Sequence, residues 1–290
     1  MKVEYFDPFN LDRLNLQPIR FSFGLVNPKG GNKATAVDEY SMKTYPHGVA
    51  LIINNEQFAR QSEREGTAID ERNLTHAFRF LGYRVEVHRN LDSKEMLAIL
   101  TEMGTRNHDR CDSFVCCILS HGKEGHVYGT DSVMVSLDDL SKKVDANHCP
   151  SLGGKPKLFF LQACRGKMKE EAVRVGTDAG DEPPPQPAEP VRVATDTGVR
   201  VATDSDTEIP ATADFFFGYA TPLGFVAWRD LDHGSWYVAE LCKALCELST
   251  HASLSDIMTR VRFEVGRGYE NIGYRMSPET TNRLQKNVFF

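Results

Sequence analysis

Three uninterrupted apolar runs constrain the fold of this chain more than any other feature. They read VALIIN (Val49–Asn54), SFVCCILS (Ser113–Ser120) and KLFFLQA (Lys157–Ala163). A strand that is apolar at successive positions has both faces buried, which is typical of a parallel sheet between two layers of helices. The runs therefore predict an α/β fold rather than a sandwich with one solvated face.

The segments between these runs have the periodicity of helices and of one further strand. YRVEVH (Tyr83–His88) alternates like a strand, and Asp92 or Ser93 is placed to cap a helix that Gly104 would end. Ser136 and Asp139 form a capping-box pattern. The apolar positions at one-face spacing are Leu74, Ala77, Phe78 and Leu81, and then Met96, Leu97, Leu100 and Met103. This alternation supports a largely parallel sheet with helices on both faces.

The pattern stops between Arg165 and Ala213. This stretch has no aromatic residue and contains DEPPPQPAEP (Asp181–Pro190), so it predicts a flexible linker. Order resumes at ADFFFGYAT, followed by expected helices from Trp236 and after Ser253 and by a strand-like QKNVFF (Gln285–Phe290). The expected organisation is an N-terminal arm (1–45), a first ordered region (46–165), the linker (166–212) and a second ordered region (213–290).

Composition excludes several classes of protein. The net charge of −6 gives no reason to expect nucleic-acid binding or attraction to a membrane surface. The beginning, MKVEYFDPFN, lacks the apolar core of a secretory signal, and the longest apolar run is too short to span a bilayer. The seven cysteines have no paired metal-ligand spacing. We expect a reduced, intracellular protein without a structural metal.

Two of the buried strands lead into residues that could carry chemistry. SFVCCILS leads to His121 and Gly122, and KLFFLQA leads to Cys164 and, two residues later, Gly166. The carboxyl ends of parallel strands gather at one edge of a sheet, and a cysteine nucleophile needs a base and oxyanion donors there. The glycines would let the backbone turn sharply and expose N–H groups. A single histidine or cysteine at a strand end is more often solvated or inert, so the spacing by itself does not decide.

The sequence around Cys164 is a more specific indication than the spacing. His121 lies 43 residues before Cys164, and QACRG (Gln162–Gly166) matches a signature of caspases. The chain resembles the caspase family from about Tyr45 to its end, apart from the linker. Further matching stretches are IINNEQF (Ile52–Phe58), REGT (Arg64–Thr67), LSHGKEG (Leu119–Gly125), GKPKLFFLQACRG (Gly154–Gly166), AWRD (Ala227–Asp230) and GSWYV (Gly234–Val238).

The resemblance implies a six-stranded, mostly parallel caspase-like sheet and hydrolysis of peptide bonds after aspartate. It implies that Cys164 is the nucleophile, that His121 is the acid–base group, and that the N–H groups of Gly122 and Cys164 form the oxyanion hole. A backbone carbonyl, and no aspartate, would orient the histidine. The ordered regions would be a large and a small subunit that pair into a homodimer through the last strand, near Thr281–Phe290. A cytoplasmic apoptotic protease with no cofactor is expected, with protein substrates and possible upstream caspases and inhibitor proteins as partners.

The resemblance also implies the substrate pockets. Planar guanidinium groups bind a carboxylate well, and the match puts Arg64, Arg229 and Gln162 in the S1 pocket. Val226 and Trp228 would line S2, and Trp236 would wall S4. Asp230 stands where relatives that favour an acidic P4 residue usually carry asparagine, and its carboxylate would repel P4 aspartate. Together with a short segment between Val265 and Arg275, this predicts a small aliphatic P4 residue such as valine.

The linker contains a repeated word. VRVATDTGVRVATDSD (Val191–Asp206) contains the same hexapeptide, VRVATD, twice, and VRVGTD (Val173–Asp178) is a third near-copy. Each copy ends in Thr-Asp before a small residue, and polar linkers are readily cut by proteases. Asp178, Asp196 and Asp204 are therefore candidate processing sites, with valine at P4. The alternative is a duplicated linker without selected meaning.

Two other interpretations stay open. One is a catalytically silent caspase homologue that acts as a regulator or scaffold, which the presence of Cys164, His121, Arg64, Gln162 and Arg229 disfavours. The other is the catalytic part of an initiator caspase. Asp230 and the short segment before Arg275 favour an initiator, whereas the short N-terminal arm favours an effector.

Overall fold

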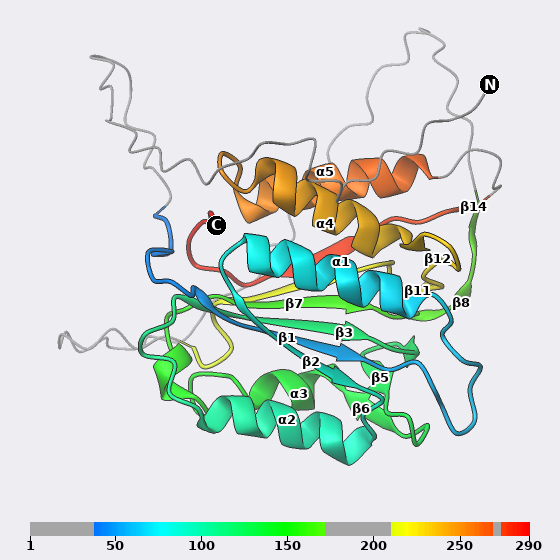
Figure 1. Cartoon of the computed structure of the whole chain (residues 1–290), viewed down its shortest axis with the longest axis horizontal. Helices are drawn as coiled ribbons and strands as arrows, with labels where there is room; N and C mark the ends of the chain where they lie inside the picture. Colours follow the sequence, from blue (N-terminus) through cyan, green and yellow to red (C-terminus); the bar gives the residue numbers. More distant parts are fainter. Residues whose placement is uncertain (1–37, 172–209, 269–273) are drawn as a thin grey trace, which may run out of the picture.

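A six-stranded sheet forms the centre of the molecule. The computed structural model describes residues 38–171, 210–268 and 274–290 (Figure 1). In spatial order the strands are β15 (Glu279–Asn282), β10 (Phe215–Tyr219), β7 (Lys157–Gln162), β3 (Ser113–Leu119), β1 (Gly48–Asn54) and β2 (Arg84–Arg89). Only β15 is antiparallel to its neighbour. The predicted α/β fold with a mostly parallel sheet is confirmed.

Helices cover both faces of this sheet (Figure 1). One layer holds α1 (Thr67–Phe80), α4 (Trp236–Leu248) and α5 (Leu254–Arg267), and the other holds α2 (Ser93–Thr105) and α3 (Leu137–Lys142). Alternate residues of β1 enter the two cores: Ala50 and Ile52 pack under the first layer, and Leu51 and Ile53 under the second. Because both faces are buried, the central strands are apolar at successive positions, with polar residues at their ends only.

Side-chain caps mark the starts of α2, α3 and α5. Asp92 and Glu95 form a capping box at α2, and Ser253 forms another with Asp256 at α5. The Ser136 hydroxyl accepts two backbone N–H groups at α3. Gly104 does not end α2, which continues to Thr105; it is the point of close approach to α3, since a Cβ there would lie 2.0 Å from the carbonyl oxygen of Lys143.

Short strands lie beyond the carboxyl ends of β3 and β7 (Figure 1). One small sheet contains β4 (Gly122–Lys123), β5 (His126–Tyr128) and β6 (Met134–Ser136). Three pairs are formed by β8 (Gly166–Met168) with β11 (Gly224–Phe225), β9 (Glu170–Glu171) with β14 (Tyr274–Arg275), and β12 (Arg229–Asp230) with β13 (Gly234–Ser235). A 3₁₀ turn spans Pro150–Leu152. Strands of two or three residues are too short for periodicity to predict.

The prediction of a strand over QKNVFF was wrong. The last strand is β15, four residues of the more polar sequence just before it. Val288 is instead buried in the core under α1, α4 and α5, and its carbonyl accepts the N–H of Leu254. Asn287 exchanges backbone hydrogen bonds with Asp38 and Tyr40. Since β15 pairs with the free edge of β10, the apolar residues at the end of the chain pack on the core as an irregular segment.

The described ends of the predicted arm and linker pack on the fold. Tyr40 is buried, and its hydroxyl donates to the carboxylate of Asp214. Residues 166–171 form β8 and β9, which pair with later strands. The rest of the arm (1–37) and of the linker (172–209), including Asp178, Asp196 and Asp204, lies outside the described residues, so the division into four parts stays a prediction.

Candidate active site

The neighbouring strands β3 and β7 bring His121 and Cys164 together. Leu119 is opposite Gln162 in the parallel register, and each candidate residue follows its strand by two positions. The backbones stay in contact beyond the strands: a Cβ on Gly122 would lie 2.7 Å from the carbonyl oxygen of Cys164. The predicted nucleophile and base therefore lie at the same edge of the sheet.

The two glycines of this edge allow close approach of neighbouring backbone segments. Neither Gly122 nor Gly166 has a positive φ. A Cβ on Gly166 would lie 2.0 Å from the carbonyl oxygen of Gly224, on the adjoining strand β11. Both positions are too crowded for a side chain, which is a reason for glycine that was not predicted from the sequence.

A backbone carbonyl holds the histidine, as expected. Nε2 of His121 lies 2.8 Å from the carbonyl oxygen of Ser62. A carbonyl can only accept a hydrogen bond, so Nε2 carries the proton and Nδ1 is left as the proton acceptor. The ring of Phe58 packs against the imidazole with 4.7 Å between centroids. Ser62 and Phe58 both lie in the loop between β1 and α1.

The surroundings of His121 favour a neutral imidazole. Partial burial lowers its pKa, and the positive charges of Arg64 and Arg229 lower it further, while the hydrogen bond to Ser62 acts in the opposite direction. The net shift of the pKa is downward from the usual histidine value. A neutral ring at neutral pH is the form that can accept a proton from a thiol.

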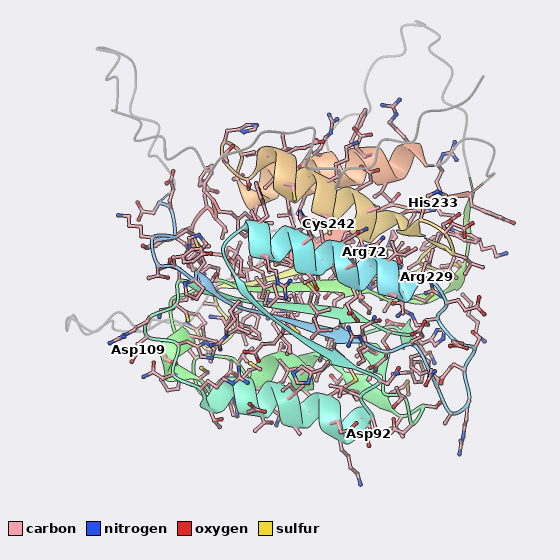
Figure 2. The ribbon with its side chains drawn as sticks, in the orientation of Figure 1. Arg72, Asp92, Asp109, Arg229, His233 and Cys242 are labelled. Carbon is pink, nitrogen blue, oxygen red and sulfur yellow. The ribbon has the colours of Figure 1, made fainter. Side chains whose placement is uncertain are left out.

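Two arginines from distant parts of the chain converge beside this pair. Arg64 precedes α1, is only 2% exposed, and donates through Nη1 to the carbonyl of Asn55 and the hydroxyl of Thr67. Burial and then the charge of Arg229 lower the pKa of Arg64 to about 9. Arg229, in β12, donates from Nε to the carbonyl of Glu65 at 2.7 Å. Figure 2 shows Arg229 at the end of the molecule toward which the central strands point.

Gln162 completes the predicted S1 set. It is the last residue of β7 and is 3% exposed, and its Oε1 has no hydrogen-bond partner in the described part of the chain. A buried amide oxygen without a partner is uncommon in folded proteins, and this one is available to an N–H donor of a ligand. Arg64, Gln162 and Arg229 thus place polar side chains around the edge that carries Cys164.

Aromatic rings form a stack beside the nucleophile. Trp228 lies between Trp236, 6.3 Å away between centroids, and Tyr274, 5.0 Å away. The ammonium group of Lys169 lies 5.5 Å from the Trp228 ring and 5.0 Å from the Tyr274 ring. The sequence predicted both tryptophans but neither Tyr274 nor Lys169, which join the stack through the pairing of β9 with β14.

The backbone from Val226 onward runs along the same edge. The N–H of Val226 donates to the carbonyl of Met168 at 2.9 Å, and the N–H of Ala227 points to Sγ of Cys164 at 3.4 Å. The predicted S2 residues Val226 and Trp228 therefore flank the residue whose N–H contacts the nucleophile.

Asp230 is held by the residues that follow it. Its Oδ1 accepts the N–H groups of Asp232 at 2.8 Å and His233 at 2.9 Å, and it lies 2.9 Å from Nδ1 of His233. Slight burial acts to raise the pKa of Asp230, but these contacts outweigh it and hold the pKa below its usual value. Asp230 is thus a carboxylate, with one oxygen engaged by its own loop. Most of the segment before Arg275 (269–273) lies outside the described residues.

The model of the caspase domain matches residues 47–289 of this chain. The chain belongs to the caspase family. It is 36% identical to caspase-9 of Homo sapiens over 282 residues, which are 92% of this chain and 67% of that protein. It is 33% identical to caspase-3 of Bos taurus over 277 residues, or 92% of this chain and 93% of that protein. With caspase-8 of Rattus norvegicus the identity is 33%, over 87% of this chain and 52% of the relative.

Membership of the caspase family defines the class of chemistry. The chain is a cysteine-type endopeptidase and belongs to a family of proteases that act in apoptosis. Proteases of this family cleave proteins after aspartate. Within residues 38–171, 210–268 and 274–290, no three or more histidine, cysteine, aspartate or glutamate side chains form a group that could hold a metal ion. The described helices include none that could cross a membrane.

Proposed function

We propose that Cys164 and His121 carry out the peptide-bond hydrolysis of this caspase-family chain, and that Arg64, Gln162 and Arg229 select aspartate at P1. One observation supports this most strongly. The register of β3 and β7 sets His121 beside Cys164, with Nδ1 left as a proton acceptor by the bond from Nε2 to Ser62. The same edge holds the two arginines, whose charges act on His121.

The first half of the reaction forms an acyl-enzyme. Nδ1 of His121 takes the thiol proton of Cys164, and the sulfur attacks the carbonyl carbon of the P1 aspartate. The carbonyl oxygen becomes an oxyanion, which the N–H groups of Gly122 and Cys164 stabilise. The imidazolium then gives its proton to the leaving amine as the C–N bond breaks. The hydrogen bond to Ser62 keeps the ring in one orientation during both transfers.

The second half restores the enzyme. His121 takes a proton from a water molecule, whose oxygen attacks the thioester carbon, and the C–S bond then breaks. The sulfur leaves with the proton held by His121, and the product carries a new carboxyl group. No group outside the protein and water is needed to balance these steps.

P1 selection follows from charge and shape. Arg64 and Arg229 each keep N–H donors beyond those used for Asn55, Thr67 and Glu65, since a guanidinium has five. Two such groups can bind the two oxygens of one short carboxylate, and the Gln162 amide adds a further donor.

The pockets beyond P1 favour small residues in this proposal. Val226 and Trp228 line S2, Trp236 walls S4, and Asp230 disfavours an acidic P4 residue. The ionised state of Asp230 supports this, although one of its oxygens is occupied by His233. Valine is expected at P4. A peptide library that shows a strong preference for P4 aspartate would contradict this expectation.

We further propose that cleavage after Asp178, Asp196 or Asp204 separates a large subunit (46–165) from a small subunit (213–290). The arm (1–45) and linker (166–212) flank them, and a homodimer through the last strand is the expected assembly. It is supported by the place of β15 at the sheet edge, where one side pairs with β10. All seven cysteines are free, in keeping with a cytoplasmic protein. Upstream caspases and inhibitor proteins are the expected partners.

Mass spectrometry of the purified protein beside Cys164→Ala tests the proposal. We expect cleavage after one or more of these linker aspartates in the wild type only. A Val-Ala-Thr-Asp reporter peptide is the second measurement, because an intact wild type that still cleaves the reporter would be an active enzyme that does not cut its own linker. Failure of the wild type to cut either its linker or the reporter would contradict the proposal and favour the silent homologue.

A further inference from the structure

A buried carboxylate lies behind the proposed S1 pocket. Asp70, in the first turn of α1, has no exposed surface. One of its oxygens accepts the N–H of Ser235 at 2.7 Å, and the other accepts the Ser235 hydroxyl at 2.5 Å. A Cβ on Gly234, whose φ is +83°, would lie 2.5 Å from the same carboxylate. The turn before α4 is therefore fitted closely around Asp70.

The fold brings Asp70 close to both arginines. Ser235, which bonds to Asp70, pairs with Arg229 between β12 and β13, and Thr67, which accepts a hydrogen bond from Arg64, lies in the same turn of α1 as Asp70. The negative charge of Asp70 raises the pKa of Arg64 and of Arg229, against the burial that lowers the pKa of each. Within the described residues Asp70 forms no ion pair with either guanidinium, because the hydrogen bonds of Arg64 and Arg229 go to other partners. Asp70 thus acts on the arginines through its charge and not through a direct hydrogen bond.

The charges of this region balance only when a substrate is present. Two guanidinium groups and one carboxylate leave a net positive charge of one, and a P1 carboxylate would cancel it. Glu56 also attracts both arginines and Glu65 attracts Arg229. Glu56 is partly exposed and Glu65 is exposed, so solvent screens their charges more than that of Asp70. Burial raises the pKa of Asp70 above the usual aspartate value, although the bonds from Ser235 and then the charges of the two arginines favour its ionised form. It also lies at the N-terminus of α1 and beside that of α4, where a negative charge is stabilised.

We propose that Asp70 is a positioning residue of the S1 pocket that stabilises the pocket when it is empty and limits its affinity for an anionic P1 residue. The inference rests on the proposed roles of Arg64 and Arg229. It predicts two opposite effects of removing the charge of Asp70: the free protein becomes less stable, and P1 aspartate binds more tightly. A carboxylate with a purely structural role would give only the loss of stability.

Asp70→Asn is suited to test this. Asparagine has the same shape, can accept the N–H of Ser235, and can donate to the Ser235 hydroxyl in place of accepting from it. The arginines keep their contacts with Asn55, Thr67 and Glu65, so the geometry of the pocket is unchanged. The wild type and Asp70→Asn therefore differ by one unit of buried negative charge.

Two reversible inhibitors separate the charge effect from the rest of the site. Val-Ala-Thr-Asp aldehyde and Val-Ala-Thr-Ala aldehyde both form a hemithioacetal with Cys164, in which the S–C bond forms and the thiol proton ends on the former aldehyde oxygen. They differ at P1 only. For Asp70→Asn we expect the ratio of inhibition constants, alanine over aspartate, to rise by about tenfold, and the Tm of the free enzyme to fall. The Tm gained on adding the aspartyl aldehyde should exceed the gain of the wild type.

Matched variants separate the charge of Asp70 from its hydrogen bonds and from a general loss of stability. Asp112→Asn removes a mostly buried carboxylate just before β3, at the opposite end of the sheet, and should leave the ratio unchanged. Asp109, a near neighbour in sequence, marks that end in Figure 2. Ser235→Ala removes the hydroxyl but keeps the charge of Asp70, and should lower Tm without raising the ratio. Asp70→Ser is a second charge-free variant, so the test does not depend on one substitution folding well.

The outcomes distinguish this inference from the proposed function. A wild type that binds both aldehydes equally would overturn the S1 roles of Arg64 and Arg229, and the inference with them. A wild type that prefers the aspartyl aldehyde supports those roles. If Asp70→Asn and Asp70→Ser then leave the ratio unchanged or lower it, the inference about Asp70 alone is overturned.

Discussion

At the scale of single residues, the protonation of His121 sets the acid limit of activity. The histidine must be neutral to take the thiol proton, and its pKa is lowered by burial and by the charges of Arg64 and Arg229. Activity should therefore persist as pH falls through the ordinary histidine pKa of about 6.5, and decline only below it. The measurement is kcat/KM for a Val-Ala-Thr-Asp reporter against pH. An acid limb above the ordinary histidine value would contradict the assigned surroundings of His121.

Phe58 contributes to this shift. The centroid of its ring lies 4.7 Å from that of the imidazole, so we expect Phe58 to contribute to the burial of His121. For Phe58→Ala we expect the acid limb of kcat/KM to move to higher pH and kcat to fall, because the imidazole is better solvated and less firmly oriented. Phe80→Ala is the matched control, since Phe80 is 45% exposed at the end of α1. A lower kcat with an unmoved acid limb would assign Phe58 a packing role only.

The sequence predicted some of these residues and not others for a physical reason. His121, Cys164 and the arginines carry recognisable chemistry next to recognisable motifs. Ser62 acts through its backbone carbonyl, which leaves no trace in the residue type. Asp70 is held by a contact with Ser235, 165 positions away, which no local pattern encodes.

At the scale of elements, α2 offers a test of stability separate from chemistry. Asp92 accepts the N–H groups of Lys94 and Glu95 and completes a capping box. Asp92→Ala should cost about 1 kcal/mol of the free energy of unfolding, measured by urea denaturation. Ser253→Ala removes the cap of α5 and should cost a similar amount. Both variants should retain the kcat of the wild type, and a large loss of kcat in either would show that the caps also position the site.

Element length decided how well local structure could be predicted. Strands β1, β3 and β7 were predicted because each is apolar at several successive positions. The four longer helices were predicted because each has several apolar residues at helical spacing. The strands beyond the carboxyl ends of β3 and β7 have two or three residues and are fixed by pairing with distant segments. QKNVFF has the composition of a strand, but it does not pair with the central sheet. Val288 is buried in the core from an irregular segment.

At the scale of the whole molecule, the segments on either side of the linker build one sheet. Strand β10, after the linker, pairs in parallel with β7, before it, along five residue pairs. Phe216 of β10 and Phe160 of β7 lie 6.1 Å apart in the core under α1, α4 and α5. Neither segment can bury its apolar face without the other, so cleavage of the linker should leave the two parts associated.

This association can be tested through Phe216. After cleavage of the linker, the wild-type fragments should elute together in size-exclusion chromatography and separate only in denaturant. Phe216→Ala removes a ring that is 2% exposed and should cost about 3–5 kcal/mol of the free energy of unfolding, so that the cleaved fragments separate at lower urea concentration. Phe263→Ala, at a position in α5 that is 57% exposed, is the matched control and should behave like the wild type. If Phe216→Ala fragments separate at the same urea concentration as the wild type, the shared core is not what holds the two parts together, and the backbone pairing of β7 with β10 must supply most of that free energy.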